Sequence, residues 1–251
     1  MESVVIIGAG QASAFAVLTL RKEGFNGRIS IISDEANVFY ERPPLSKGIL
    51  SGTDAVEKLA FFNAETIKNS NIDWHRPLKA THINRGEKTV SINNGTDIPY
   101  DKLIIATGSR PRVPNEKWLK LNNVYTLRTI QDALTLKEML TRNKTIAIIG
   151  GGWIGLEVAA TANTLGLNVH VFEREARLCS RSVISEVSDH LYMLHQNEGT
   201  HIYLNASDIT LSENDDQSIT IHNGNLSVTA DIVLVGAGAA VVAQIPFGHD
   251  R

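Results

Sequence analysis

Residues Lys144–Ala160, which read KTIAIIGGGWIGLEVAA, decide the fold of this chain. A short apolar run meets a cluster of glycines, and alanine-rich sequence with helical character follows. Strand, glycine turn and helix in this order predict an α/β unit with a parallel sheet. Glu157 stands out within the stretch, because a carboxylate among residues suited to burial needs a partner.

The chain contains this pattern twice. Val4–Leu20 reads VVIIGAGQASAFAVLTL, and each copy is followed by a second apolar strand that ends in acid, in Arg28–Glu35 and in Val169–Glu175. Each copy then shows a hairpin turn signal, at Asn93–Gly95 and at His222–Gly224, before an aspartate and a last buried strand. The repetition predicts an α/β fold with two tandem Rossmann-like dinucleotide-binding domains, each with a β-hairpin insertion. We place these domains at residues 1–113 and 114–238.

Each copy aligns with the G-x-G-x-x-G pattern, the fingerprint of dinucleotide-binding turns, and each of its three positions has a separate physical role. Gly8 and Gly150 allow the tight turn, and Gly10 and Gly152 let the backbone approach a pyrophosphate at the helix N-terminus. The third position, where helix and strand pack closely, is Gly155 in the second copy. In the first copy it is Ser13, a residue small enough to be tolerated there.

The acid that closes the second strand is expected to bind ribose hydroxyls. In the first copy this residue is Asp34 or Glu35, and in the second it is Glu173. A carboxylate repels a 2′-phosphate, so Glu173 favours NAD over NADP. Arg174 and Arg177 lie nearby and weaken that preference.

Composition excludes several other functions. A formal net charge of −3 lacks the positive excess that is typical of proteins that bind nucleic acid. The longest apolar runs are far too short to cross a membrane. Neither a secretory signal nor a Cys/His cluster is visible, so we expect a cytoplasmic chain without a metal site. Cys179 is the single cysteine and is expected to be an inert thiol.

Four strings carry a family resemblance: FYERPPLSKGIL (Phe39–Leu50), IIATGSRPR (Ile104–Arg112), YTLRT (Tyr125–Thr129) and the GGGWIGLE already quoted. Together they resemble the FAD-dependent pyridine nucleotide-disulfide reductase superfamily. More narrowly, the chain is similar to the ferredoxin–NAD reductase components of bacterial aromatic-ring dioxygenases, the type that serves 3-phenylpropionate and cinnamate. The disulfide-reductase branch needs a pair of redox cysteines, and one cysteine cannot supply it.

The resemblance implies FAD in the first domain and NAD in the second. It implies that Lys47 lies beside the flavin and pairs with Glu157, and that Trp153 shields the nicotinamide-facing side of the ring. The two prolines of ERPPLSK are expected to form a rigid loop that holds Lys47. The remaining cofactor-binding residues implied by the resemblance are Arg42, Ala80, Thr107, Gly108, Arg128, Ile154, Gly236 and Gly238.

The implied reaction passes a hydride from NADH to FAD and then single electrons to a ferredoxin that feeds a ring-hydroxylating dioxygenase. Two alternatives stay open: an NADH oxidase or rubredoxin reductase of the same superfamily, and an inactive, truncated nucleotide-binding fragment. The second alternative arises at residues 239–251, which read AAVVAQIPFGHDR where relatives return to the FAD domain with a Gly-Asp pair. From this tail we expect a C-terminally truncated chain that binds FAD weakly.

Overall fold

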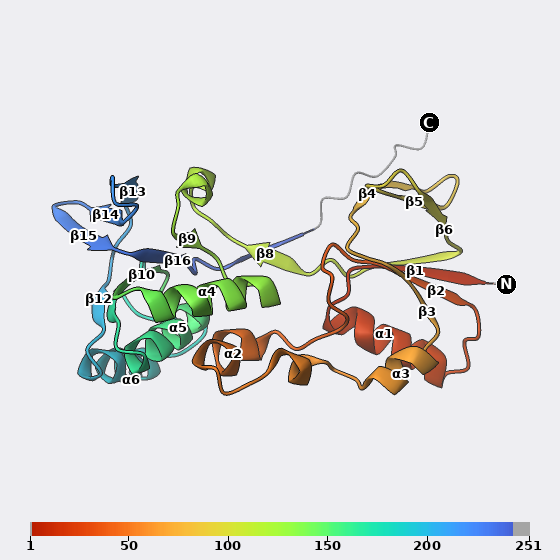
Figure 1. Cartoon of the computed structure of the whole chain (residues 1–251), viewed down its shortest axis with the longest axis horizontal. Helices are drawn as coiled ribbons and strands as arrows, with labels where there is room; N and C mark the ends of the chain where they lie inside the picture. Colours follow the sequence, from red (N-terminus) through yellow and green to blue (C-terminus); the bar gives the residue numbers. More distant parts are fainter. Residues whose placement is uncertain (1, 243–251) are drawn as a thin grey trace. The chain divides into compact units, whose positions relative to one another are not determined.

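The computed structural model describes residues 2–242, which form two compact units (Figure 1). The first unit contains the chain up to Glu41, then Glu57–Ser109 and the last described residues. The second unit contains Arg42–Val56 and Arg110–Ala240. The segment that carries ERPPLSK therefore belongs by its contacts to the second unit, although the domain boundaries expected from the sequence place it in the first.

The first unit is built on a four-stranded parallel sheet with the strand order β3-β2-β1-β7. A separate three-stranded antiparallel sheet has the order β4-β5-β6, and the expected turn at Asn93–Gly95 joins its last two strands. The elements of this unit are β1 (Ser3–Ile7), α1 (Gln11–Lys22), β2 (Arg28–Ile32), η2 (Val56–Leu59), α3 (Ala64–Asn69), β3 (Ile72–His75), β4 (Ala80–Asn84), β5 (Thr89–Ile92), β6 (Asp97–Pro99) and β7 (Lys102–Ile105).

Strand β1 is buried on both faces because side chains alternate across a strand. Ile6 packs with Ala14 and Val17 of α1, whereas Val5 packs with Ile83 of β4 and its neighbours. Helix α1 and strands β4–β6 accordingly lie on opposite sides of the parallel sheet (Figure 1). This burial explains why the strand reads as a continuous apolar run.

The second unit repeats this plan with a five-stranded parallel sheet of order β12-β11-β10-β16-β9. A three-stranded antiparallel sheet, β13-β14-β15, contains the expected turn at His222–Gly224 and packs on one face of the parallel sheet. The elements are η3 (Glu116–Lys120), β9 (Val124–Tyr125), α4 (Ile130–Arg142), β10 (Thr145–Ile149), α5 (Trp153–Thr164), β11 (Asn168–Phe172), α6 (Ser185–Asn197), β12 (His201–Tyr203), β13 (Ile209–Glu213), β14 (Ile219–Asn223), β15 (Leu226–Ala230) and β16 (Ile232–Val235).

The ERPPLSK segment is helical, which corrects the expected rigid loop. Pro43–Ser46 form the 3₁₀ helix η1, and Gly48–Ser51 form the short helix α2. Proline is compatible with this conformation because it occupies only the first turn of a helix, where its missing N–H is not needed. Leu45, Ile49 and Leu50 are buried, and the segment packs on α4 and α5. Lys47 is therefore held by two packed helical turns.

Strands β8 (Ser109–Pro111) and β17 (Ala239–Val241) form a two-stranded sheet, and the division into units falls within both strands. The first residues of the tail at 239–251 thus form an ordinary strand. Residues 243–251 of that tail lie outside the described part of the chain.

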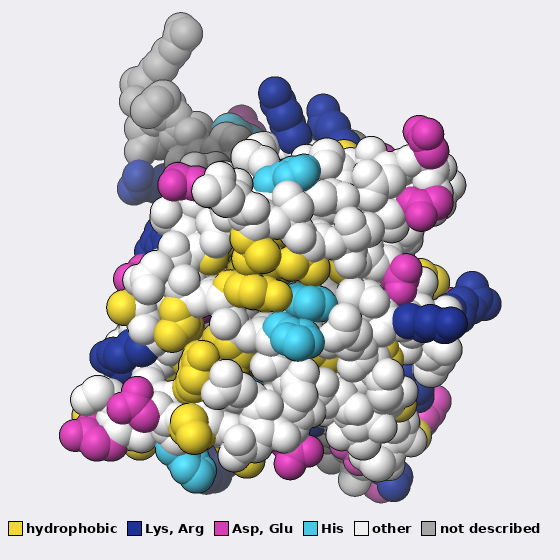
Figure 2. Space-filling view, turned by 90° about the vertical axis from the view of Figure 1, so that its left-hand side faces the viewer, with side chains coloured by type: hydrophobic (Ala, Val, Ile, Leu, Met, Phe, Trp, Pro, Cys, Tyr) yellow, Lys and Arg dark blue, Asp and Glu magenta, His cyan; other side chains and the backbone are white. Residues whose placement is uncertain are grey.

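Figure 2 looks onto the side of the chain that is at the left in Figure 1. Hydrophobic and histidine side chains lie together near the middle of this face, whereas Lys, Arg, Asp and Glu side chains are scattered toward its edges. Across residues 2–242, no helix is both long and apolar enough to cross a membrane. The same residues contain no group of three or more His, Cys, Asp or Glu side chains placed to hold a metal ion.

Candidate functional site

The glycine turn of the second unit follows β10. Gly150 adopts φ +118°, its N–H donates to the Phe172 carbonyl at 2.8 Å, and a Cβ atom placed on it would lie 2.4 Å from the Gly236 carbonyl oxygen. Only glycine fits this conformation and this close approach. Gly152 precedes the first residue of α5, and a Cβ there would meet only open space. The backbone at the start of α5 is therefore uncovered toward that space.

The first unit has the same turn after β1. Gly8 adopts φ +106°, donates to the Ile32 carbonyl at 2.8 Å, and would place a Cβ 2.3 Å from the Ala106 carbonyl oxygen. Gly10 stands before α1 with open space where its Cβ would be. Both turns thus present the free N–H groups of a helix N-terminus beside an unobstructed backbone, which is the arrangement that binds a pyrophosphate.

The third fingerprint position differs between the units. A Cβ on Gly155 would lie 2.1 Å from the Gly150 carbonyl oxygen, so a side chain there requires the backbone to move. Ser13 occupies the corresponding place in the first unit, is completely buried, and has no hydrogen-bond partner for its Oγ among the described residues. The first unit accommodates a side chain at a helix–strand contact that in the second unit is too close for one.

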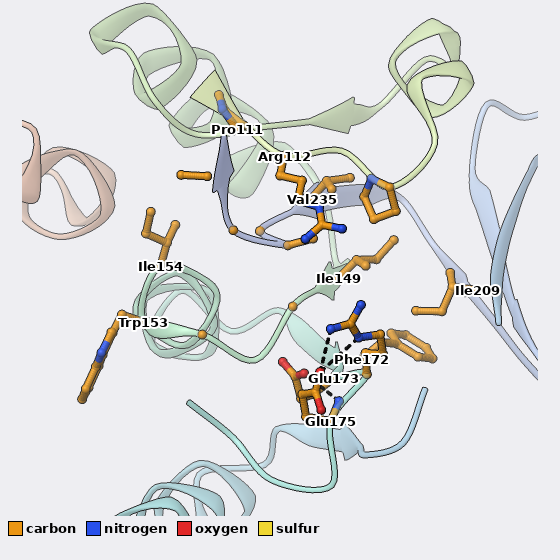
Figure 3. A pocket seen from close by; sticks show the side chains of 18 of the residues that line it. Pro111, Arg112, Ile149, Trp153, Ile154, Phe172, Glu173, Glu175, Ile209 and Val235 are labelled. Carbon is orange, nitrogen blue, oxygen red and sulfur yellow. Dashed lines mark hydrogen bonds and ion pairs between the residues drawn. The ribbon is translucent and has the colours of Figure 1, made fainter. Parts of the chain in front are cut away.

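A cavity of about 560 Å³ opens at the carboxyl ends of the second unit's parallel strands (Figure 3). This is where open α/β sheets bind ligands. The glycine turn, the end of β11 and the end of β16 all contribute to its lining. Its lining includes Gly150, Gly152, Trp153, Ile154, Glu173, Arg174, Glu175, Cys179, Gly236 and Gly238.

Glu173 is held at the cavity wall by backbone groups. The N–H of Gly151 donates to its Oε2 at 2.6 Å, and the N–H of Glu175 donates to its Oε1 at 2.8 Å. Each carboxylate oxygen keeps lone-pair capacity for a further donor. Figure 3 shows Glu173 and Glu175 together beside Phe172, at the end of β11. A ribose that enters this cavity would find a fixed carboxylate acceptor.

The structure brings Lys47 and Glu157 together. Lys47 Nζ lies 2.8 Å from Glu157 Oε1, with side-chain exposures of 54% and 25%. The buried Ser46 donates from its Oγ to the other oxygen, Oε2, at 2.5 Å. Both oxygens of Glu157 are thus bonded from the ERPPLSK segment. This supplies the partner that a carboxylate near the start of α5 needs.

Trp153 and Ile154 begin α5 at the cavity rim, and both are about half exposed. A tryptophan so exposed is free of the packing that would fix it in a core. Cys179 is buried at the cavity wall, and burial raises the pKa of its thiol, with the charge of Glu173 adding to the effect. A thiol with a raised pKa is a poor nucleophile at neutral pH, in line with the inert role expected for it.

Of the residues expected to bind FAD, Asp34 and Glu35 follow β2 and Thr107 and Gly108 follow β7, the two strands that flank β1. Asp34 is exposed, whereas Glu35 accepts a hydrogen bond from the Tyr40 hydroxyl. Thr107 and Gly108 follow β7, and the Thr107 hydroxyl donates to the Val242 carbonyl. Ala80 is buried at the start of β4.

Arg42 and Arg128, both expected at the flavin, are adjacent in the second unit. Arg42 Nη1 donates to the carbonyl oxygen of Arg128 at 2.6 Å. Arg128 precedes the capping box of α4, in which Thr129 and Asp132 exchange side-chain to backbone hydrogen bonds. The bond fixes the ERPPLSK segment to the start of α4. At the end of β16, Gly236 and Gly238 border the cavity, and Gly238 accepts the N–H of Arg112 at 2.9 Å.

Sequence reasoning gave no role to Ser46 or Glu175, which the structure places against Glu157 and Arg174. Ser46 stands directly before Lys47, and a hydroxyl next to that lysine in a proline-fixed segment is a usable signal. Glu175 was seen only as the end of an acidic strand, and Arg174 only as a positive charge that weakens the NAD preference. Arg174 and Glu175 are adjacent in the chain, and no periodic pattern in a sequence predicts that adjacent side chains form an ion pair.

Fold and sites together define a protein with two Rossmann-like units, each with a glycine turn of nucleotide-binding geometry. The family of pyridine nucleotide-disulphide oxidoreductases matches residues 2–246 of the sequence. The chain therefore belongs to this family.

Among similar proteins, the 3-phenylpropionate/cinnamic acid dioxygenase ferredoxin–NAD(+) reductase component of Photorhabdus laumondii is 35% identical, over 97% of this chain and 62% of its own length. The ferredoxin–NAD(+) reductase component of the p-cumate 2,3-dioxygenase system of Pseudomonas putida is 36% identical, over 95% of this chain and 58% of its own length. The chain thus spans about three-fifths of these two relatives.

A solved structure of the covalent putidaredoxin reductase–putidaredoxin complex shares the fold. The similarity has a TM-score of 0.88 and 32% identity, and covers 95% of this chain and 58% of the solved chain. The fold of this chain is therefore already known from experiment.

Proposed function

We propose that this chain binds FAD at the glycine turn of the first unit and NADH in the cavity of the second, and that it acts as a ferredoxin–NAD reductase. The observation that carries the proposal is the repeated turn: two glycine positions of left-handed backbone, each before a helix whose first N–H groups face open space. One chain with two such turns is suited to two dinucleotides.

The residues present fit both groups. At Gly10 and Gly152 a Cβ would occupy the space through which a pyrophosphate must approach the helix, and glycine leaves that space empty. Glu173 offers acceptors for ribose hydroxyls. In the first unit, Ser33 takes the place of Glu173, and the acids available to a ribose are Asp34 and Glu35, the next two residues. NAD rather than NADP follows from Glu173, because a carboxylate repels a 2′-phosphate.

Lys47, Glu157 and Trp153 are the residues to which we assign the electron-transfer site. Lys47 supplies a positive charge that favours an electron-rich ring, and Glu157 orients the ammonium while Ser46 orients Glu157. Trp153 is half exposed at the cavity rim and would shield a bound flavin from solvent until NADH binds. When bound, FAD accepts two electrons as a hydride and releases them singly, which is why a flavin joins a nicotinamide to a one-electron carrier.

The electron acceptor is a small ferredoxin that serves an aromatic-ring-hydroxylating dioxygenase of the 3-phenylpropionate and cinnamate type. The similarity to two dioxygenase reductase components supports this acceptor, and the likeness to a reductase solved in complex with putidaredoxin supports a protein carrier. A cytoplasmic location belongs to the same proposal, because NADH and the ferredoxin are both cytoplasmic reactants.

The test is a reconstitution. The purified chain is incubated with FAD, desalted, and assayed for flavin absorbance and for NADH-dependent cytochrome c reduction with and without added ferredoxin. Because FAD binding is expected to be weak, we expect flavin to be retained only in part and, with FAD kept in the assay, cytochrome c reduction that depends on the ferredoxin. Equal rates without ferredoxin, with oxygen consumed, would instead identify an NADH oxidase. Failure to retain any flavin would identify a nucleotide-binding fragment without this activity.

Lys47 gives a sharper prediction. Lys47→Met removes the charge and leaves the packed segment in place, because the neighbours Leu45, Ile49 and Leu50 carry the burial. Flavin reduction by NADH in stopped-flow measurements should slow by about tenfold or more, the size expected for a well-placed charge at a reacting centre. Lys58→Met, which removes a charge from the exposed surface of the first unit, is the control. Equal rates for both variants would remove Lys47 from the mechanism.

A further inference from the structure

The wall of the second unit's cavity contains three consecutive charged residues at the end of β11: Glu173, Arg174 and Glu175. Glu173 is engaged by two backbone N–H groups and stays available to a ribose. Arg174 is the only cation of the three. Its guanidinium would be the natural ligand of a phosphate on that ribose, because its planar donors match phosphate oxygens.

Arg174 is held by its neighbour. Its Nε and Nη2 donate to Glu175 Oε1 at 3.1 and 2.7 Å. The hydrogen bond and charge of Glu175 raise the pKa of Arg174, and the charge of Glu173 adds to this effect. The backbone fixes Glu175 in turn, since its N–H donates to Glu173 and its carbonyl accepts the N–H of Asn205 at 3.1 Å. The guanidinium of Arg174 is therefore directed toward Glu175 at the rim of the cavity.

We propose that Glu175 is a specificity-determining residue of this cavity: by holding Arg174, it withholds from 2′-phosphorylated dinucleotides the guanidinium that would bind them. The inference rests on the proposed function, in which this cavity takes the adenosine ribose of NADH. Glu173 acts by direct repulsion of a 2′-phosphate. Glu175 is a positioning residue and acts through Arg174.

The expected effect follows from the exposure of the pair. The two side chains are 63% and 44% exposed, so their mutual attraction is weak and a doubly charged phosphate can compete for Arg174 once Glu175 is neutral. Glu175→Gln keeps the size of the side chain and removes its charge. A gain of about threefold to tenfold in affinity for a 2′-phosphorylated ligand corresponds to a surface charge interaction of this kind.

Isothermal titration calorimetry on the purified chain can test this with ADP-ribose and with 2′-phospho-ADP-ribose, which need no flavin. Glu175→Gln should tighten binding of 2′-phospho-ADP-ribose by about threefold or more and leave ADP-ribose within about twofold. The gain should disappear in the double variant Arg174→Ala/Glu175→Gln, and it should shrink as salt is raised. Glu198→Gln removes the same charge from an exposed position at the end of α6 and should change neither affinity.

Three results would overturn the inference. They are an unchanged affinity for 2′-phospho-ADP-ribose in both Glu175→Gln and Glu175→Ala, a gain that persists without Arg174, and an equal gain in Glu198→Gln. If the wild-type chain binds ADP-ribose in these experiments, the proposed nucleotide site stands even when the role of Glu175 fails. If it binds neither ligand, both proposals fall together.

Discussion

The two glycine turns of this chain have nearly the same backbone but hold their acids differently. Gly8 and Gly150 both have a positive φ. The N–H of each donates at 2.8 Å to the last carbonyl of the neighbouring parallel strand, β2 in the first unit and β11 in the second. In the first unit, Glu35 is bonded by the side chain of Tyr40. In the second, Glu173 is bonded by the backbone of the glycine turn itself, through Gly151. The glycine turn of the second unit thus holds the residue that directly follows β11, whereas in the first unit Ser33 follows β2 and Tyr40 bonds an acid two residues further on.

The difference shows which parts of a duplicated fold are constrained. A Cβ on Gly8 or Gly150 would lie 2.3 or 2.4 Å from a backbone carbonyl oxygen, so neither copy accepts another residue at this position. The third position and the residues after the second strand depend on local packing, and there the copies have diverged. Substitutions at matched positions can test this contrast.

The largest effect is expected at the third fingerprint position. Gly155→Ala should lower the free energy of unfolding of the second unit by about 3 kcal/mol, because the new Cβ would meet the Gly150 carbonyl oxygen 2.1 Å away and the backbone must yield. Hydrogen exchange of the β10 amides, compared with those of β1, reports the two units separately. Ser13→Gly in the first unit is the matched control. Unchanged protection of β10 would show that the helix can shift without cost.

The next effect concerns pH. His170 of β11 is buried and stacks on His201, and burial, aided by the charge of His201, lowers the pKa of His170 from 6.5 to about 4. The folded state therefore disfavours protonation, so stability is present above pH 6.5 and is lost as pH falls toward 4. Between pH 7 and pH 5 the second unit should lose about 2 kcal/mol. Ser30 stands at the corresponding position of the first unit.

Urea unfolding at several pH values, read by hydrogen exchange of β10 and β1, measures this slope for each unit. His170→Gln should flatten the slope of the second unit and leave that of the first unchanged. A residual slope is expected from His195, because burial also lowers the pKa of that residue. An equally steep slope in the variant would assign the effect to other groups.

A smaller effect is expected where an aspartate just before one strand of the parallel sheet bonds the start of its neighbour, β16 to β10 in the second unit and β7 to β1 in the first. Asp231 accepts the backbone N–H groups of Lys144 and Thr145, each at 2.9 Å, and Asp101 accepts the N–H and hydroxyl of Ser3 at 2.7 and 2.9 Å. Asp231→Ala should cost the second unit about 1.5 kcal/mol, the value of hydrogen bonds to a charged acceptor. Asp101→Ala should act in the same direction but less strongly, because its surroundings are exposed.

Thermal melts of the two variants give the comparison, with Asp208→Ala as a control for an exposed aspartate. The hydrogen bonds from Ser3 lower the pKa of Asp101, so its contribution is present above about pH 4 and is lost below that value. If the melting temperature falls more for Asp101→Ala than for Asp231→Ala, the prediction that Asp231 contributes more to stability is wrong.

The smallest predicted change is a gain. Ser13→Ala should stabilise the first unit by about 1 kcal/mol, because it removes a buried hydroxyl that has no hydrogen-bond partner among the described residues. Differential scanning calorimetry would detect this as a raised melting temperature. A lowered melting temperature would reveal a hydrogen bond to that hydroxyl.

The sequence predicted the elements that depend on neighbouring residues. Strands β1 and β10, the glycine turns, the helices that follow and the hairpin turns were all expected where the structure has them, because alternation, helical propensity and glycine conformation act over a few residues. The ERPPLSK segment was expected as a loop, because two prolines read as a break in a helix. Their position in the first turn, where proline is allowed, is visible only once Leu45, Ile49 and Leu50 are seen to pack on α4 and α5.

By itself the sequence determined the α/β class, the repeated nucleotide-binding turn and, through resemblance, the residues to consider as partners. Only the tertiary structure decided that Ser46 bonds the second oxygen of Glu157, that Glu173 is held by Gly151, and that Glu175 occupies Arg174. Strands and turns follow from local sequence. The first two contacts join segments that are distant in the chain, and the third depends on the directions of neighbouring side chains at the end of β11, which no sequence pattern specifies.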